Sequence, residues 1–307
     1  MALHPFFATT VSKSVGNKTL SSGTPEDARS MVAAGRATLG SGPDMSSVEQ
    51  VTIDSRGGPL SARILIPYGK VVGVVVYLHG GGWVVGSIDD FDTLARALAE
   101  RTGCAVVLPD YRLAPEHPFP AALEDAEDAI QWVAESRTKY FGDALPMVIA
   151  GDSAGANLAT VAARRLAAEV ELALQVLIYP VTSADFDSAS YLDASDGMPL
   201  TRQDMRWFFS HYAPEEAWSR PDVTPASATD LAILPPAAIV TAEHDVLRSD
   251  GCVYARALQE AGVQVSYRQY SGMVHGFVRL HNNLDIADAA VTDISESIVQ
   301  AINSGPS

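Results

Sequence analysis

The chain has 307 residues, 47% apolar and 19% charged, so it is long enough for one large domain with a substantial core. Its 37 acidic and 21 basic residues give a formal charge of −16, which repels polyanions and argues against nucleic-acid binding. No apolar stretch reaches the roughly 18 residues of a membrane span, and the first residues lack a signal-peptide pattern. The sequence therefore predicts a cytoplasmic protein that binds neither nucleic acid nor a membrane.

The first 45 residues are rich in Ser, Thr, Gly and Ala. Phe6 and Phe7 stand near the start, and the only helical pattern is PEDARSMVAAGR at residues 25–36. This segment differs in texture from the chain that follows, so residues 1–45 are predicted to lie outside the main sheet.

From residue 46 onward, apolar β-branched segments alternate with helical ones. Strands are predicted at residues 48–54, 61–67, 71–78, 104–109, 146–151, 173–180, 236–242 and 263–270. Helices are predicted at residues 89–103, 120–136, 156–170 and 250–262. Continuous apolar strands separated by helices predict an α/β fold with an eight-stranded, mostly parallel sheet covered on both faces. Because no helix separates the first two strands, they are expected to be antiparallel.

One region interrupts this alternation, at residues 183–229. It contains DMRWFFSHYAPEEAW, an aromatic and helix-like stretch between two predicted strands. Such an insertion is typical of a helical cap over a site, and we expect residues 1–45 to form the other part of that cap. Residues 46–182 and 230–307 then make up the catalytic domain. The alternative is a surface excursion with a small core of its own.

The stretch MVIAGDSAGANLATVAARR predicts a nucleophile. It contains Gly151-Asp152-Ser153-Ala154-Gly155 between a strand and a helix, which is the context in which a G-x-S-x-G turn exposes its serine. Glycines flank the serine because the turn is too tight for a Cβ on either side. A serine hydroxyl is a weak nucleophile until a base takes its proton, and the base needs a third group to orient it.

Later strand ends offer the acid and the base in the expected order. His275 closely follows the last strand and is the predicted base, whereas His281 is expected to begin the final helix. Asp245 is the predicted acid. Glu243, nearer the strand, is expected to support the loop, and Asp250 to lie in the first turn of the next helix.

The third strand runs into His79-Gly80-Gly81-Gly82-Trp83. Glycine-rich turns also bind phosphate, but a Rossmann fingerprint would need glycine at position 85, which is Val85, and no Walker Lys-Ser/Thr pair follows. A tetrahedral intermediate instead needs N–H donors close to its oxygen. In serine hydrolases of this fold the donors come from the residue after the nucleophile and from the loop after the third strand, which HGGGW occupies. His79 is expected to support this loop.

These motifs together resemble the hormone-sensitive-lipase-like family of α/β-hydrolase esterases, also called bacterial family IV. HGGGW, YRLAPEHPFPAALED, GDSAGANLA, DVLRSDG and GMVHGF carry the resemblance, which covers most of the chain from about Val51 onward. It implies a carboxylic ester hydrolase with nucleophile Ser153, base His275 and acid Asp245. It also implies a two-part cap and an oxyanion hole formed by the N–H groups of Gly81, Gly82 and Ala154. Two positions depart from the family pattern, Ala156 where glycine is usual and Val246 where proline is usual.

The sequence indicates the substrate-contacting residues less clearly than the catalytic ones. Trp83, Asp152, Trp207 and Phe208 are the candidates, and packing inside the protein is the alternative for the aromatic ones. We expect a small ester substrate with a short to medium acyl chain, no cofactor and no metal. A lipase, an amidase or a dehydratase on the same fold, or a non-catalytic receptor, are the alternatives. The chain is expected to be a monomer or a homodimer, in which the strand at 263–270 would pair across the interface.

Overall fold

The computed structural model describes residues 2–14, 18–194 and 197–304. Residues 1, 15–17 and 195–196 of the predicted cap and residues 305–307 of the predicted catalytic domain lie outside the described residues.

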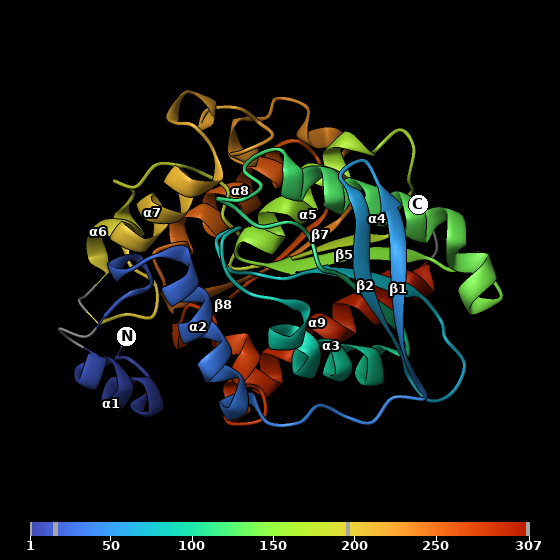
Figure 1. The fold of residues 1–307 in the computed structure, drawn as a ribbon, viewed down its shortest axis with the longest axis horizontal. Coiled ribbons are helices and arrows are strands. Elements are labelled where there is room, and N and C mark those ends of the chain that lie inside the picture. Colours follow the sequence, from blue (N-terminus) through green and yellow to red (C-terminus); the bar gives the residue numbers. More distant parts are fainter. Residues whose placement is uncertain (1, 15–17, 195–196, 305–307) are drawn as a thin grey trace.

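Within these ranges, eight strands form one sheet in the order β1-β2-β4-β3-β5-β6-β7-β8 (Figure 1). The strands are β1 (Ser47–Ser55), β2 (Gly58–Ile66), β3 (Val74–Leu78), β4 (Ala105–Pro109), β5 (Met147–Asp152), β6 (Leu174–Ile178), β7 (Ala237–His244) and β8 (Val265–Val274). β1 pairs antiparallel with β2 and β2 antiparallel with β4, while the other neighbours are parallel. The predicted eight-stranded α/β sheet with an antiparallel start is confirmed.

Helices cover both faces of the sheet because each presents one apolar side to it. On one face lie α4 (Ala121–Phe141), α5 (Ala154–Arg165) and α8 (Arg248–Glu260), and on the other α3 (Ile88–Thr102) and α9 (Asp285–Ser304) (Figure 1). The inner strands β3 to β6 are buried along their whole length, as expected of a parallel sheet covered on both sides. The position of α9 corrects one expectation. His281 does not begin it, because a separate 3₁₀ turn (Phe277–Leu280) comes first.

The helices of the N-terminal segment and of the insertion lie at the left of Figure 1. The N-terminal segment contributes α1 (Pro5–Ser14) and α2 (Pro25–Gly35), and the insertion contributes α6 (Ala189–Asp193) and α7 (Arg202–Tyr212). The Ser21 N–H donates to the Asp204 carboxylate at 2.9 Å, which ties the two segments together. The remaining 3₁₀ helices are Leu20–Ser22, Arg36–Leu39, Glu215–Ala217, Pro225–Ser227 and Leu231–Ile233.

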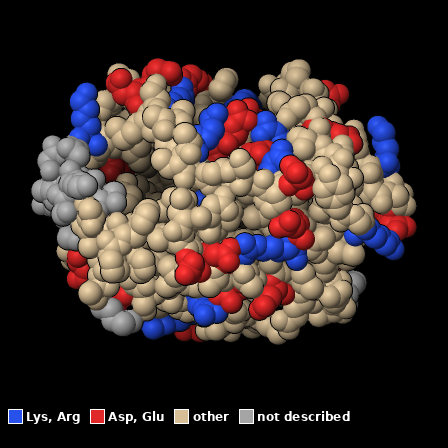
Figure 2. Space-filling model, turned by 90° about the horizontal axis from the view of Figure 1, so that it is seen from below, with Lys and Arg blue, Asp and Glu red and all other residues tan. Residues whose placement is uncertain are grey.

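The surface carries its charges mixed. Figure 2 shows Lys and Arg interspersed with Asp and Glu on the face seen from below Figure 1, with no continuous basic area there. In the part of the chain that the structure describes, no helix is long and apolar enough to cross a membrane.

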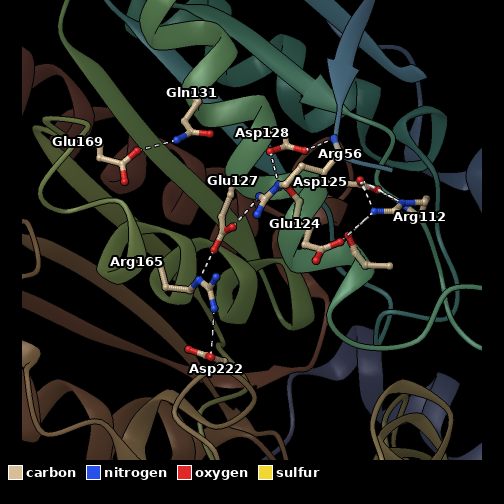
Figure 3. Close-up of polar contacts among 11 residues, drawn as sticks. Arg56, Arg112, Glu124, Asp125, Glu127, Asp128, Gln131, Arg165, Glu169 and Asp222 are labelled. Atoms are coloured by element: carbon tan, nitrogen blue, oxygen red, sulfur yellow. Dashed lines mark hydrogen bonds and ion pairs between the residues drawn. The ribbon is translucent and has the colours of Figure 1, made fainter. Parts of the chain in front are cut away.

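Ion pairs connect the insertion to the core (Figure 3). Glu127 of α4 is 3% exposed and pairs with Arg56 from the β1–β2 turn at 2.6 Å, and also with Arg165 of α5. Arg165 reaches Asp222 of the insertion at 3.2 Å, and Arg164 binds the same carboxylate at 2.6 Å. The C-terminal end of α5 is therefore an anchor for the insertion.

Candidate active site

Ser153 stands at a strained turn between β5 and α5. Its φ of 55° is in the left-handed region, which is uncommon for a residue with a side chain. The turn is pressed against the end of β3. A Cβ on Gly155 would lie 2.0 Å from the Leu78 carbonyl oxygen, and one on Gly151 would lie 2.5 Å from Gly155. Both flanking glycines are therefore required by close approach of the backbone, as the sequence motif predicts.

The Gly155→Ala variant should be strongly destabilised because its methyl group would overlap main-chain atoms that cannot move independently. We expect the free energy of unfolding to fall by at least about 2 kcal/mol in denaturant titrations. Gly35→Ala is the matched control, because nothing lies within 4 Å of a Cβ at that position and its φ of −72° suits alanine. The two variants unfolding alike would contradict this packing.

His275 and Asp245 meet at the ends of β8 and β7. The His275 Nδ1 lies 2.8 Å from Asp245 Oδ2, and the other carboxylate oxygen accepts the Leu247 N–H at 2.9 Å. The Asp245 side chain is fully buried, so its charge is held next to the imidazole without competition from water. This pair orients the ring with Nδ1 as the donor and leaves Nε2 free to act as a base.

The two other acids considered from the sequence have other partners. Glu243 accepts the Gly272 N–H at 2.8 Å and so supports the loop before His275. Asp250 is fully buried in the first turn of α8, and one of its oxygens accepts the Thr182 and Ser183 N–H groups at 2.9 Å each. It therefore fixes the start of the insertion.

Burial raises the pKa of Asp250 to about 7, against the two hydrogen bonds that lower it. The native state keeps this proton over a range, about pH 4 to 7, in which the unfolded chain has lost it. Raising the pH through that range therefore lowers the free energy of unfolding. Asp250→Asn has no such proton to lose. Its free energy of unfolding, relative to that of the wild type, should therefore rise by up to about 1.4 kcal/mol per pH unit across this range. Denaturant titrations at pH 5, 6 and 7 measure it, and parallel profiles for the two proteins would contradict it.

The glycine loop after β3 is compressed between neighbours. Gly81 and Gly82 have φ of 130° and 58°, and a Cβ on Gly81 would lie 2.0 Å from the Val85 carbonyl oxygen. A Cβ on Gly82 would lie 2.2 Å from the Phe208 ring of the insertion. Bare backbone here lets the loop fold back on itself and lets Phe208 pack directly on it.

Asp152 and His79 hold this loop in place through hydrogen bonds. Asp152 Oδ1 accepts the Gly80 N–H at 2.8 Å and the Tyr77 hydroxyl at 3.0 Å. Burial raises the pKa of Asp152 to about 6. His79 bonds the Gly80 carbonyl oxygen through Nδ1 at 2.8 Å and stacks on Tyr111 with ring centroids 4.3 Å apart. Burial lowers the pKa of His79, which favours its neutral form.

A cavity of about 180 Å³ brings these elements together. Its polar side chains are Asp152, Ser153, His275 and Arg279, and its wall includes Gly80, Gly81, Gly82, Gly86 and Gly276. The rest of the wall is apolar and comes from the N-terminal segment, the insertion and the core: Leu20, Val32, Val85, Phe91, Pro199, Leu200, Met205 and Phe208. A small, mostly apolar cavity with few convergent polar groups is typical of a small-molecule site.

Two of the aromatic candidates lie elsewhere. Trp83 is fully buried and stacks on Tyr212 of α7 with centroids 4.1 Å apart, and it is not among the residues that line this cavity. Trp207 contacts Phe208 and His211 edge-on and is likewise not part of the lining. Arg279 is a lining residue that sequence reasoning missed. The sequence signal for it was its position four residues after His275, the predicted base.

No group of three or more His, Cys, Asp or Glu side chains that could hold a metal occurs among the described residues.

The family follows from comparison with known proteins. A family model described as alpha/beta hydrolase fold matches residues 75–279. The chain belongs to the α/β hydrolases. The Mycobacterium tuberculosis carboxylesterase NlhH is 44% identical to this α/β hydrolase over 212 residues, which cover 67% of the chain and 66% of that relative. An ethyl acetate hydrolase of Pseudomonas putida is 40% identical over 230 residues, covering 74% of this chain and 72% of its own.

A solved structure agrees over nearly the whole α/β hydrolase. The hyperthermophilic esterase from the archaeon Pyrobaculum calidifontis superposes with a TM-score of 0.90 at 36% sequence identity, covering 98% of this chain and 99% of its own. The resemblance to hormone-sensitive-lipase-like esterases seen in the motifs is thereby confirmed.

Proposed function

We propose that this enzyme hydrolyses small carboxylic esters with Ser153 as nucleophile, His275 as base and Asp245 as the acid that orients it. The protein is a serine carboxylesterase by its family and relatives. The single observation that carries the assignment of roles is the hydrogen bond between His275 and buried Asp245 beside a cavity lined by Ser153.

The reaction has two halves. Ser153 attacks the ester carbonyl while His275 Nε2 takes its proton, and Asp245 stabilises the imidazolium that forms. The N–H groups of Gly81, Gly82 and Ala154 bind the oxyanion, and His275 then protonates the leaving alcohol. Water, activated by the same imidazole, releases the acid.

The cap is part of the proposal. Residues 1–45 and 183–229 form it, and residues 46–182 and 230–307 form the catalytic domain. The supporting observation is that Leu20, Val32, Leu200 and Phe208, from both cap segments, line the cavity over Ser153. A covered cavity of about 180 Å³ suits short to medium acyl chains rather than long ones. Within the site, Phe208 is the cap aromatic placed to touch the substrate.

The proposal also includes the oligomeric state and the cellular location of the protein. We expect a monomer or a homodimer. Among the described residues β7 is the only strand beside β8, and the Gly272 carbonyl oxygen accepts the His4 N–H, so the outer edge before Gly272 is the part that could pair with a second copy. Sedimentation velocity would distinguish the two states. A cytoplasmic location stays a prediction.

A fluorophosphonate probe tests the assignment directly, since only an activated serine reacts with it. The expected result is one phosphonylated residue, Ser153, with loss of hydrolysis of p-nitrophenyl acetate, butyrate and octanoate in proportion to labelling. An unlabelled protein without hydrolysis of any of these esters would overturn the proposal. A preference for esters longer than octanoate would make the enzyme a lipase and correct only the acyl range.

A further inference from the structure

Arg279 stands out among the polar groups of the cavity wall. Ser153 and His275 belong to the proposed reaction, and Asp152 supports the glycine loop, because its Oδ1 accepts the Gly80 N–H and the Tyr77 hydroxyl. Arg279 is the one polar lining side chain of the described cavity that has neither role. In small-molecule sites, such convergent polar groups fix the orientation of the ligand.

The guanidinium group of Arg279 is held by contacts other than an ion pair, although its charge opposes the rise in the pKa of the buried Asp152 carboxyl. It lies over the Phe91 ring, 4.4 Å from the centroid, and one Nη donates to the Asp90 carbonyl oxygen at 2.9 Å. Its Nε is buried and has no hydrogen-bond partner among the described residues, and no carboxylate of those residues forms an ion pair with it. The neighbouring Asp90 carboxylate is engaged by Arg36 at 3.0 Å.

A buried donor without an acceptor is costly, and a planar cation facing an apolar cavity is best satisfied by a planar anion. Among the described residues only one Nη is used, by the Asp90 carbonyl oxygen, so the N–H groups of the other Nη are the donors left for a ligand in the cavity. We propose that Arg279 is a specificity-determining residue that binds a carboxylate on the substrate, so that half-esters of short dicarboxylic acids are preferred. This inference rests on the proposed ester hydrolysis and names its substrate class.

The long-range field of the protein does not favour anions, since its formal charge is −16. The face shown in Figure 2 carries both signs interspersed. Recognition of a carboxylate must therefore come from the short-range contact with Arg279. Measurements at about 0.15 M salt screen the long-range repulsion and isolate that contact.

The test compares pairs of esters of equal shape. Monomethyl succinate is compared with methyl 4-methylpentanoate, and monomethyl glutarate with methyl 5-methylhexanoate, in which an isopropyl group replaces the carboxylate. Titration of the released acid gives kcat/KM for each ester with the wild type, Arg279→Met and Arg279→Lys. The readout is the ratio of the half-ester value to the neutral value, so a general loss of activity cancels.

We expect the wild type to prefer at least one half-ester over its neutral partner. The ratio should fall about tenfold or more in Arg279→Met and recover in part in Arg279→Lys, which keeps the charge but not the fork of donors. The control is Arg256→Met, an exposed arginine on α8, which should leave the ratio unchanged.

Each outcome has a separate meaning. Equal ratios in the wild type and Arg279→Met, or a wild type that prefers both neutral esters, overturn the role of Arg279 while leaving the esterase assignment intact. Should the wild type hydrolyse no ester and leave the fluorophosphonate unreacted, the proposed function itself fails. If Arg279→Met does not fold by circular dichroism, Arg279→Lys and Arg279→Gln decide in its place.

Discussion

Ser153→Ala is expected to lose about 10⁵-fold or more in kcat for p-nitrophenyl esters, since removal of the nucleophile of a serine hydrolase has effects of this size. The thermal midpoint should change by no more than a few degrees. Alanine keeps the Cβ that the strained turn already accommodates at a φ of 55°, and it removes only the hydroxyl oxygen.

The measurement is a progress curve with the enzyme in excess over the ester. Hydrolysis by a contaminating esterase would be recognised because its dependence on pH and on inhibitors differs from that of the wild type. Ser183→Ala is a matched control. Its side chain lies outside the cavity, so hydrolysis should be unchanged. Substantial turnover by Ser153→Ala that survives repurification would exclude this serine as the nucleophile.

Asp245→Asn is expected to lower kcat by about 10⁴-fold, because an amide favours the wrong tautomer of the base and cannot stabilise its charged form. The volume of the side chain is unchanged, and the Leu247 N–H still finds an acceptor oxygen. The loss should therefore appear in turnover and not in stability. Initial rates across pH together with a denaturant titration separate the two.

Glu243→Gln is the control for this carboxylate. Glu243 lies at the same end of β7, but its carboxylate accepts the Gly272 N–H and does not bind the His275 imidazole. A glutamine oxygen can accept the same hydrogen bond, so we expect less than about a tenfold change in kcat. Equal losses in the two variants would mean that the whole loop, and not Asp245, governs the base.

Local patterns in the sequence predicted the sheet well. Runs of β-branched residues mark strands through local preference. The glycines of the serine turn were predictable because the motif itself requires them, even though the contact that explains Gly155, with Leu78 of β3, is distant in the sequence. The order of strand ends also brought His275 and Asp245 into the same prediction, and the structure joins them at 2.8 Å.

Side-chain direction could not be predicted in the same way. Trp83 directly follows the glycine loop, yet its left-handed φ of 60° and its stacking on Tyr212 direct it into the core. That partner lies more than a hundred residues away in the insertion, so spacing carries no information about it. Arg279 was missed for a related reason. An arginine near a helix is usually exposed, and only the 3₁₀ turn after Gly276 brings it to the cavity.

The chain of ion pairs from Arg56 through Glu127 and Arg165 to Asp222 has a consequence for warm conditions. The hydration of charged groups becomes less favourable as temperature rises, so the cost of burying them falls while their attraction remains. The ion pairs between α5 and Asp222 of the insertion are therefore expected to weaken little on heating. When the enzyme is warmed, the contact between the insertion and α5, the helix that starts at the serine turn, should persist to a higher temperature than the contacts of the exposed α1.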